Sequence, residues 1–190
     1  MIQQKMILLS LLQFCKSLFY SSDNTLSENL GGIGAVIAHE ITHSFDPNGS
    51  KFDEFGNIRN WWSKEDYNKF TELLQAEIEL FDGIICGGLK TNGKLTVGEN
   101  VADLGGLTVA VETAKKENGN LQELFQAWAK IWCGKMMPQF RKSIIAYDSH
   151  APSELRSNVP AQCIGDFYQT FNIQTTDGMW LDPEKRVHIW

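Results

Sequence analysis

Two histidines and a glutamate stand in the spacing His-Glu-x-x-His at His39, Glu40 and His43. On a helix, residues four apart lie on one face, so both imidazoles can reach one ion while Glu40 lies beside an open coordination position. This arrangement is typical of a Zn²⁺ site with a bound water. The alternative is that the three side chains only solvate a helix face. The apolar flanks predict a buried segment, where such a cluster without a partner would be costly, and this favours the metal.

A second pair of acids can complete such a site. A catalytic zinc takes three protein ligands and leaves a fourth position open. Glu99 is the candidate third ligand, and Asp103 lies one helical turn further on, where it can accept the ring N–H of a zinc-bound histidine. The alternative is an acidic face near a helix N-terminus, where the helix dipole favours acids. Beside the His-Glu-x-x-His motif, the ligand interpretation is favoured.

The elements that must position these residues are mainly helical. Apolar residues at helical spacing predict a helix from Gly31 to about Phe45, with one apolar stripe that includes Ile37 and Ile41. Capping residues and apolar spacing predict four more helices. They are expected from Ser63 to about Phe81, from about Val97 to Lys116, from Asn120 to about Trp132, and from Pro138 to Tyr147. The tail after Ser149 should form short helices and turns, which gives one mainly α-helical domain.

Two long loops are expected between these helices. Residues 47–62 combine Gly, Asn and Asp with Phe52, Phe55, Trp61 and Trp62, which predicts an ordered loop packed by its rings. A second loop is marked by four glycines between Gly83 and Gly93. Neither segment has the composition of a flexible linker.

Composition places the chain among ordinary globular proteins. It has 190 residues, with 17 Lys and Arg against 23 Asp and Glu, for a net charge of −6. An acidic chain without a cluster of basic residues argues against a nucleic-acid partner, because phosphate binding needs concentrated positive charge. The four cysteines show no Cys-x-x-Cys spacing, and their low density favours reduced thiols over a disulfide scaffold.

The first residues contain an apolar run from Met6 to Leu12. A signal peptide is poorly supported, because only Lys5 precedes the run and no small-residue cleavage site follows it. The run is also shorter than the roughly 20 residues that a membrane-spanning helix needs. A buried strand or helix is at least as good an interpretation as export, and a membrane anchor is the least favoured one.

Four stretches of the chain carry a resemblance to a known family. They are Gly31–Phe45, Phe52–Trp62, Asn92–Gly106 and His150–Arg156. Together they resemble the C-terminal catalytic segment of the neprilysin-like zinc endopeptidases, and among these the bacterial oligoendopeptidases. The resemblance covers about 18–190, so we expect an atypical segment at 1–17 and a metallopeptidase domain at 18–190. It implies a thermolysin-like, mainly α lobe with long ordered loops, without the family's upstream lid domain.

The resemblance also implies roles for the residues of the metal site. His39, His43 and Glu99 match the ligands of one Zn²⁺ ion, and Glu40 matches the general base. Asp103 matches an acid that the family places behind a zinc-bound histidine and that is sometimes described as a proton donor.

Four further matches concern the substrate. His150 matches a histidine that stabilises the transition-state oxyanion, and Arg156 an arginine that grips a substrate carbonyl. Val36 and Trp132 match walls of the pocket for the side chain after the scissile bond. Without the resemblance, His150 and Arg156 would be ordinary surface residues and Trp132 ordinary core. His188 matches no functional residue.

The function implied is zinc-dependent endopeptidase activity on oligopeptides, with cleavage on the amino side of hydrophobic residues. The family's upstream part supplies a lid and a substrate-binding strand with an Asn-Ala pair, and no such pair precedes His39. The alternative is therefore a truncated, catalytically weak zinc-binding remnant that needs a complementary upstream chain. A cytoplasmic location is expected, with export or the cell surface as the alternative.

Overall fold

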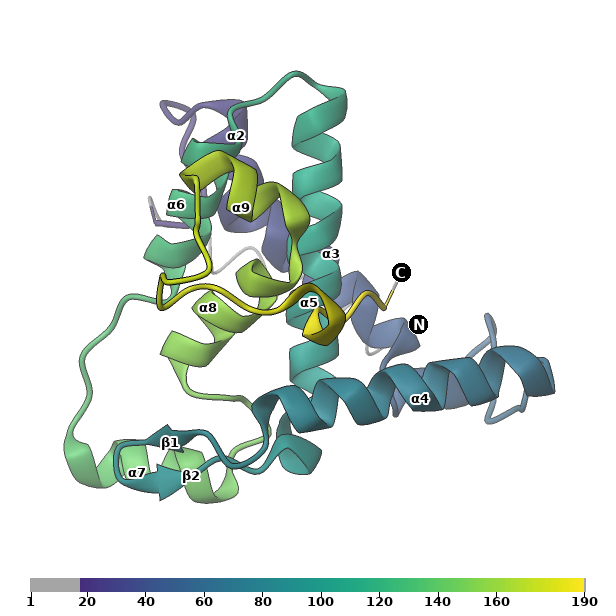
Figure 1. The fold of residues 1–190 in the computed structure, drawn as a ribbon. Helices are drawn as coiled ribbons and strands as arrows, with labels where there is room; N and C mark the ends of the chain where they lie inside the picture. The colour runs from purple at the N-terminus through teal and green to yellow at the C-terminus, as the bar shows by residue number, and fades with distance from the viewer. Residues whose placement is uncertain (1–17, 190) are drawn as a thin grey trace.

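The computed structural model describes residues 18–189 and is mainly α-helical (Figure 1). The apolar run at 6–12 and Cys15 lie outside the described residues, so the structure does not test the expectations for them. Strands β1 (Ile85–Cys86) and β2 (Leu89–Lys90) form a small antiparallel sheet. The helices are α2 (Leu26–Asn29), α3 (Ala35–Thr42), α4 (Lys64–Phe81), α5 (Gly93–Lys116), α6 (Leu121–Ile131), α7 (Pro138–Tyr147), α8 (Ser153–Cys163) and α9 (Gly165–Phe171).

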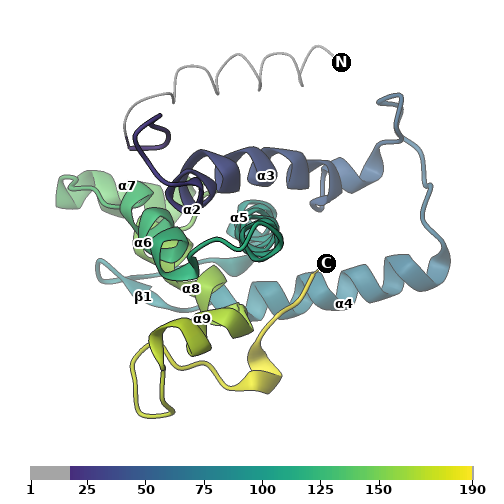
Figure 2. The same ribbon diagram turned by 90° about the horizontal axis from the view of Figure 1, so that it is seen from above.

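Helix α5 is the central element of the fold. Figure 2 shows it end-on, with α3 on one side and α4 on the other. Val101, Leu107 and Val111 on this helix have no exposed surface. A helix buried on most of its circumference belongs to the core. Polar side chains on α5, including Glu99 and Asp103, are therefore brought into the interior between neighbouring helices.

A glycine allows α3 to lie close against α5. A Cβ atom on Gly106 would lie 2.6 Å from the carbonyl oxygen of Ala35 and 2.8 Å from the backbone nitrogen of His39. Both distances are too short for a real Cβ contact, so any side chain at position 106 would push the helices apart. The glycine therefore brings His39 next to the acids of α5.

Three apolar clusters surround α5. The largest includes Leu107, Trp128 and Phe167 and joins α5, α6 and α9. The second, which includes Ile145, lies where α7 and α8 meet the small sheet. The third packs α4 and the C-terminal tail, including Val187, against the first half of α5. These clusters fix the positions of α5 and α8, which both carry candidate site residues.

Most helix boundaries agree with the capping residues. The side chains of Ser63 and Asn120 accept backbone N–H groups in the first turns of α4 and α6. The helices expected there and at Pro138 are confirmed. Helix α5 begins at Gly93 rather than near Val97, because the Asn92 side chain accepts a backbone N–H group and caps it earlier.

The segment from 83 to 93 is not the long loop that was expected. It contains the β1–β2 hairpin, in which Cys86 lies opposite Leu89. The two turn residues, Gly87 and Gly88, have φ angles of +55° and +82°. Positive φ at both central positions is typical of a tight two-residue hairpin turn, which glycine adopts without strain. The expectation was wrong because two-residue strands are too short to show an alternating pattern.

One face of α3 is exposed, although its apolar flanks predicted a buried segment. Ile37 is 44% exposed and Ile41 is 61% exposed, whereas His39 is only 8% exposed. Among the described residues, α3 packs mainly against α5, on the side that carries His39. The apolar spacing therefore identified the helix correctly, but not the side on which it is covered.

The aromatic loop at 47–62 is only partly packed by its rings. Trp62 stacks on Trp61 and on Phe70, with ring centroids 4.5 and 5.0 Å apart. Phe55 is 78% exposed at a turn next to Gly56, which has a φ of +80°. The expectation holds for the tryptophan end of the loop and is wrong for Phe55.

The described cysteines, Cys86, Cys133 and Cys163, are unpaired thiols. Cys86 and Cys163 are buried and Cys133 is exposed. Burial raises the pKa of Cys163 to about 12, so this thiol is protonated at neutral pH.

Candidate metal and catalytic site

Three side chains from α3, its C-terminal end and α5 converge on one point. The Nε2 atoms of His39 and His43 are 3.1 Å apart. The nearest Glu99 carboxylate oxygens lie 3.4 Å from the first and 3.6 Å from the second. Tetrahedral zinc ligands with bonds of about 2.0–2.2 Å lie about 3.3–3.6 Å from one another. The two Glu99 distances belong to different oxygens of one carboxylate, and the three side chains together place their donor atoms close enough to hold one metal ion.

The other ring nitrogens show why this point suits a cation. His39 Nδ1 lies 2.8 Å from Asp103 Oδ1, and His43 Nδ1 lies 2.8 Å from Asp46 Oδ2. Each imidazole with a proton on Nδ1 presents its Nε2 lone pair to the common point. Two lone pairs that face each other at 3.1 Å, beside a carboxylate, repel unless a proton or a metal cation lies between them. These donors match the nitrogen and oxygen ligands that Zn²⁺ prefers.

Asp46 is a site residue that the sequence analysis missed. It is 6% exposed, and its Oδ1 accepts the backbone N–H groups of Asn48 and Gly49, both at 2.7 Å. Its other oxygen faces His43. The segment was interpreted only as the turn that ends the helix. The signal available was an acid three residues after His43, at a spacing that brings a side chain back to the same helix face.

Asp103 occupies the position behind His39 that the sequence analysis expected. It also accepts two hydrogen bonds from Arg156, from Nε at 2.6 Å and from a terminal nitrogen at 2.8 Å. The Arg156 guanidinium lies over the Trp132 ring, 4.2 Å from its centroid. Asp103 thus ties α3, α5 and α8 together. The Arg156–Asp103 pair was not predicted. The expected hydrogen bond from Arg156 to a substrate carbonyl stays a prediction.

His150 lies at the edge of the same group. Its Nε2 is 3.1 Å from Glu99 Oε2 and its Nδ1 is 2.7 Å from Asp148 Oδ1. Nearly half of its side chain is exposed, so it faces both the candidate ligand and solvent. The loop before α8 therefore brings a potential hydrogen-bond donor to the site. The oxyanion-stabilising role that the resemblance implies for His150 stays a prediction.

The remaining expected residues lie on the surrounding elements. Glu40 is half-buried and follows His39 on α3. Val36 and Trp132 are half-buried and both pack against the largest apolar cluster. His188, which had no expected role, is exposed.

The charges of the site stabilise one another. Burial works to lower the pKa of His39, but the contacts with Asp103 and Glu99 outweigh it and raise this pKa to about 9. Burial works to raise the pKa of Glu99, but His150 and His39 hold it far below its usual value. Asp103 is likewise kept ionised, against burial, by Arg156 and His39. Without a metal the site holds protons, and a divalent cation competes with them.

Comparison with known proteins identifies the family to which this chain belongs. A sequence model of Peptidase family M13 matches residues 4–187, and the chain belongs to this family. The match includes most of the segment at 1–17. The expected division into an atypical segment at 1–17 and a metallopeptidase domain at 18–190 stays a prediction.

Among its relatives, the neutral endopeptidase of Lactobacillus helveticus is 46% identical over 172 residues. That alignment covers 90% of this chain and 27% of the relative.

Solved structures show the same fold. The crystal structure of PepO from Lactobacillus rhamnosis superposes with a TM-score of 0.88 at 44% identity, covering 93% of this chain and 28% of that one. The structure of the zinc metalloprotease Zmp1 of Mycobacterium tuberculosis, in complex with an inhibitor, superposes with a TM-score of 0.87 at 36% identity. That match covers 90% of this chain and 29% of the Zmp1 chain. This chain therefore spans between a quarter and a third of the length of these relatives. Within residues 18–189, none of the helices is both long enough and apolar enough to cross a bilayer.

Proposed function

We propose that this chain is a zinc-dependent metalloendopeptidase that hydrolyses peptide bonds of oligopeptides through an activated water. The observation that carries the proposal is the triangle formed by His39, His43 and Glu99, with Glu40 beside it on the same helix. A zinc ion held there by those three side chains would supply a Lewis acid that polarises a peptide carbonyl and lowers the pKa of water.

Glu40 is proposed as the general base. Its carboxylate would accept a proton from the attacking water and deliver it to the nitrogen of the leaving amine. Its position next to His39 and its partial exposure support this role, because the base must reach both water and substrate.

The residues around the ligands are proposed to orient and stabilise. Asp103 holds the His39 ring and keeps its proton on Nδ1, which supports positioning rather than proton donation, since its oxygens contact His39 and Arg156. His150 would donate a hydrogen bond to the developing oxyanion, an interaction whose loss typically costs about 10²–10³ in kcat.

The substrate contacts of the proposal follow the sequence analysis. Arg156 would contact a substrate carbonyl, and Val36 and Trp132 would form walls for the side chain that follows the scissile bond. Trp132 is supported by its contact with Arg156 next to the site. Cleavage before a hydrophobic residue is the specificity that we propose.

A second candidate function is favoured by the exposed apolar face of α3. Ile37 and Ile41 lie on the helix that carries the candidate ligands, and both are more than 40% exposed. A complementary polypeptide that covers this face could complete the substrate site. The chain would then bind zinc alone and cleave peptides only with that partner. A cytoplasmic location is proposed on the sequence grounds given above, and cell fractionation tests it.

Metal content and peptidase activity test the function together. The chain should bind one zinc ion and cleave a quenched fluorescent peptide in a chelator-sensitive manner. Glu40→Gln should abolish cleavage with zinc content unchanged, because Glu40 is not a ligand. Loss of zinc in this variant would contradict the assigned roles. Full zinc content without cleavage, restored by the upstream two thirds of a bacterial relative, would favour the second candidate.

A further inference from the structure

A hydrogen bond joins the two ends of the aromatic loop between α3 and α4. The indole Nε1 of Trp62 donates to the backbone carbonyl oxygen of Ser50, at 2.9 Å. Ser50 is 4% exposed and lies in the turn that follows His43. The two bonded residues are 12 positions apart in the sequence, so this bond ties the end of the loop to its beginning.

The turn that contains Ser50 is built around Asp46. The side chain of Asp46 faces His43, and its backbone carbonyl oxygen accepts the N–H of Ser50, at 2.9 Å. Its Oδ1 accepts the backbone N–H groups of Asn48 and Gly49. A Cβ atom on Gly49 would overlap the carbonyl oxygen of His43, so the turn lies directly against the end of the helix that carries the candidate ligands. A shift of Ser50 would therefore move Asp46, the partner of the His43 ring.

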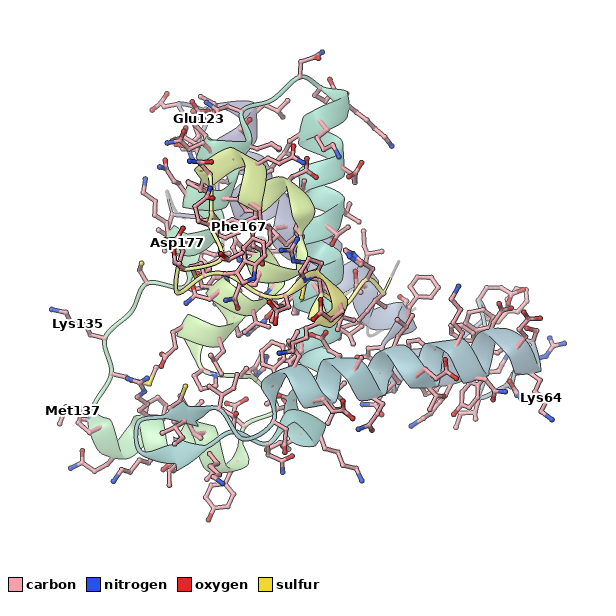
Figure 3. All side chains as sticks on the ribbon, viewed as in Figure 1. Lys64, Glu123, Lys135, Met137, Phe167 and Asp177 are labelled. Atoms are coloured by element: carbon pink, nitrogen blue, oxygen red, sulfur yellow. The ribbon has the colours of Figure 1, made fainter. Side chains whose placement is uncertain are left out.

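Trp62 is itself fixed by its contacts with α4. Its ring stacks on Trp61 and on Phe70, and the Phe70 ring lies 5.0 Å away with an interplanar angle of 16°. Phe70 is 4% exposed and belongs to the second turn of α4. Figure 3 labels Lys64, the first residue of α4, at the end of the helix that projects away from α8 and α9. Trp62 therefore connects this projecting end of α4 to the turn that carries Asp46.

We propose that Trp62 is a positioning residue of the candidate metal site and acts through Ser50 and Asp46 on the His43 ring. The inference rests on the proposed function for the metal, and peptide cleavage is not needed to test it. The indole has two separable features, which are a large ring that packs on α4 and one N–H group that reaches the turn. Packing alone would stabilise the fold without changing the metal site of the folded chain, whereas the hydrogen bond should affect metal affinity.

Phenylalanine at position 62 separates these two features. Trp62→Phe keeps an aromatic ring that can stack on Phe70 and removes the N–H group. Trp61→Phe is the matched control, because Trp61 stacks on the same ring, is 42% exposed, and donates no hydrogen bond from its indole within residues 18–189. If Trp62→Phe does not fold, β-(3-benzothienyl)alanine at position 62 takes its place, because it keeps both fused rings and lacks the N–H group.

Zinc affinity of the folded chain, measured by competition with a chelator, is the first readout. We expect Trp62→Phe to weaken it by about 2- to 10-fold, the effect of one neutral hydrogen bond, and Trp61→Phe to leave it unchanged. The loss should vanish when Trp62→Phe is combined with Asp46→Ala, because substitutions in one chain of contacts are not additive. Equal affinity of the wild type and Trp62→Phe, or a full loss in the Asp46→Ala background, would overturn the inference.

The ring protons of the two histidines give a second readout, which a purely structural role would not separate. His43 Nδ1 faces Asp46, and His39 Nδ1 faces Asp103. NMR spectroscopy of the zinc-loaded chain follows the proton on each Nδ1. Trp62→Phe should speed the exchange of the His43 proton with water and leave the His39 proton unchanged. Equal effects on both protons, or no effect on the His43 proton, would overturn the positioning role.

These measurements separate the inference from the proposed function. Zinc binding that weakens in Trp62→Phe, in a chain that cleaves no peptide, would support the positioning role and refute the peptidase. Zinc affinity and cleavage that are both unchanged in Trp62→Phe would retain the peptidase and refute the positioning role. A wild-type chain that binds no zinc would refute both.

Discussion

Replacement of Asp103 by asparagine should destabilise the chain and weaken its metal site at once. Asp103 is 1% exposed and receives two hydrogen bonds from Arg156, whose side chain is 12% exposed. Asparagine keeps the shape of the side chain and removes its charge. Removal of one partner from a buried ion pair leaves the other uncompensated and costs about 3–5 kcal/mol.

The metal effect of the same substitution comes from His39. Asp103 Oδ1 lies 2.8 Å from His39 Nδ1 and so fixes both the ring and its proton. Loss of such a partner behind a metal-bound histidine typically weakens metal binding by about 10- to 100-fold. Asp103→Asn should therefore show lower stability without metal and weaker zinc affinity.

Urea unfolding of the metal-free chain and competition with a zinc chelator measure these two effects. Glu112→Gln is the matched control, because Glu112 is an acid on the same helix, has a side chain that is 54% exposed, and pairs with Lys115. An exposed pair of this kind contributes about 0–1 kcal/mol. If Asp103→Asn changed stability by no more than the control and left zinc affinity intact, the positioning role of Asp103 would be refuted.

Three further predictions concern residues around the site. Asp46→Ala should weaken zinc binding about 10- to 100-fold in chelator competition, because it frees the His43 ring; unchanged affinity would show that the helix alone orients this ring. Gly106→Ala should lower zinc content, since its Cβ would lie 2.6 Å from a backbone oxygen of α3, whereas Gly134→Ala, with open space around it, should not. Burial raises the pKa of Glu77 from 4.5 to about 8, so the folded chain keeps a proton that the unfolded chain releases. This contribution to stability should be fully present below about pH 4.5 and fall by about 1.4 kcal/mol per pH unit up to about pH 8; Glu77→Gln should remove that slope in urea unfolding, and an unchanged slope would contradict the buried, protonated state.

Local signals in the sequence predicted much of the site. The spacing of His39 and His43 on one helix determines their separation, because helix geometry is the same in every protein. Glu99 and Asp103 were identified by the same rule on a second helix. The start of α6 was predictable because the Asn120 side chain caps it through local contacts. The catalytic roles of Glu40 and Asp103 remain predictions.

The remainder depends on contacts between distant segments. The Arg156–Asp103 pair joins residues 53 positions apart, and it forms only because α8 packs beside α5. The exposed face of α3 was not predictable, because an apolar stripe indicates a covered face without showing what covers it. The Gly87–Gly88 hairpin was missed because its strands are shorter than the period-two pattern that identifies a strand.

Two imidazoles and one carboxylate of this chain are proposed to hold a single zinc ion. Zinc X-ray absorption spectroscopy of the purified chain, combined with metal analysis, tests it most directly. We expect one zinc per chain, with nitrogen and oxygen neighbours at about 2.0–2.2 Å and an imidazole signature that persists in Glu40→Gln. Substoichiometric zinc in the folded chain, or sulfur neighbours at about 2.3 Å, would contradict it.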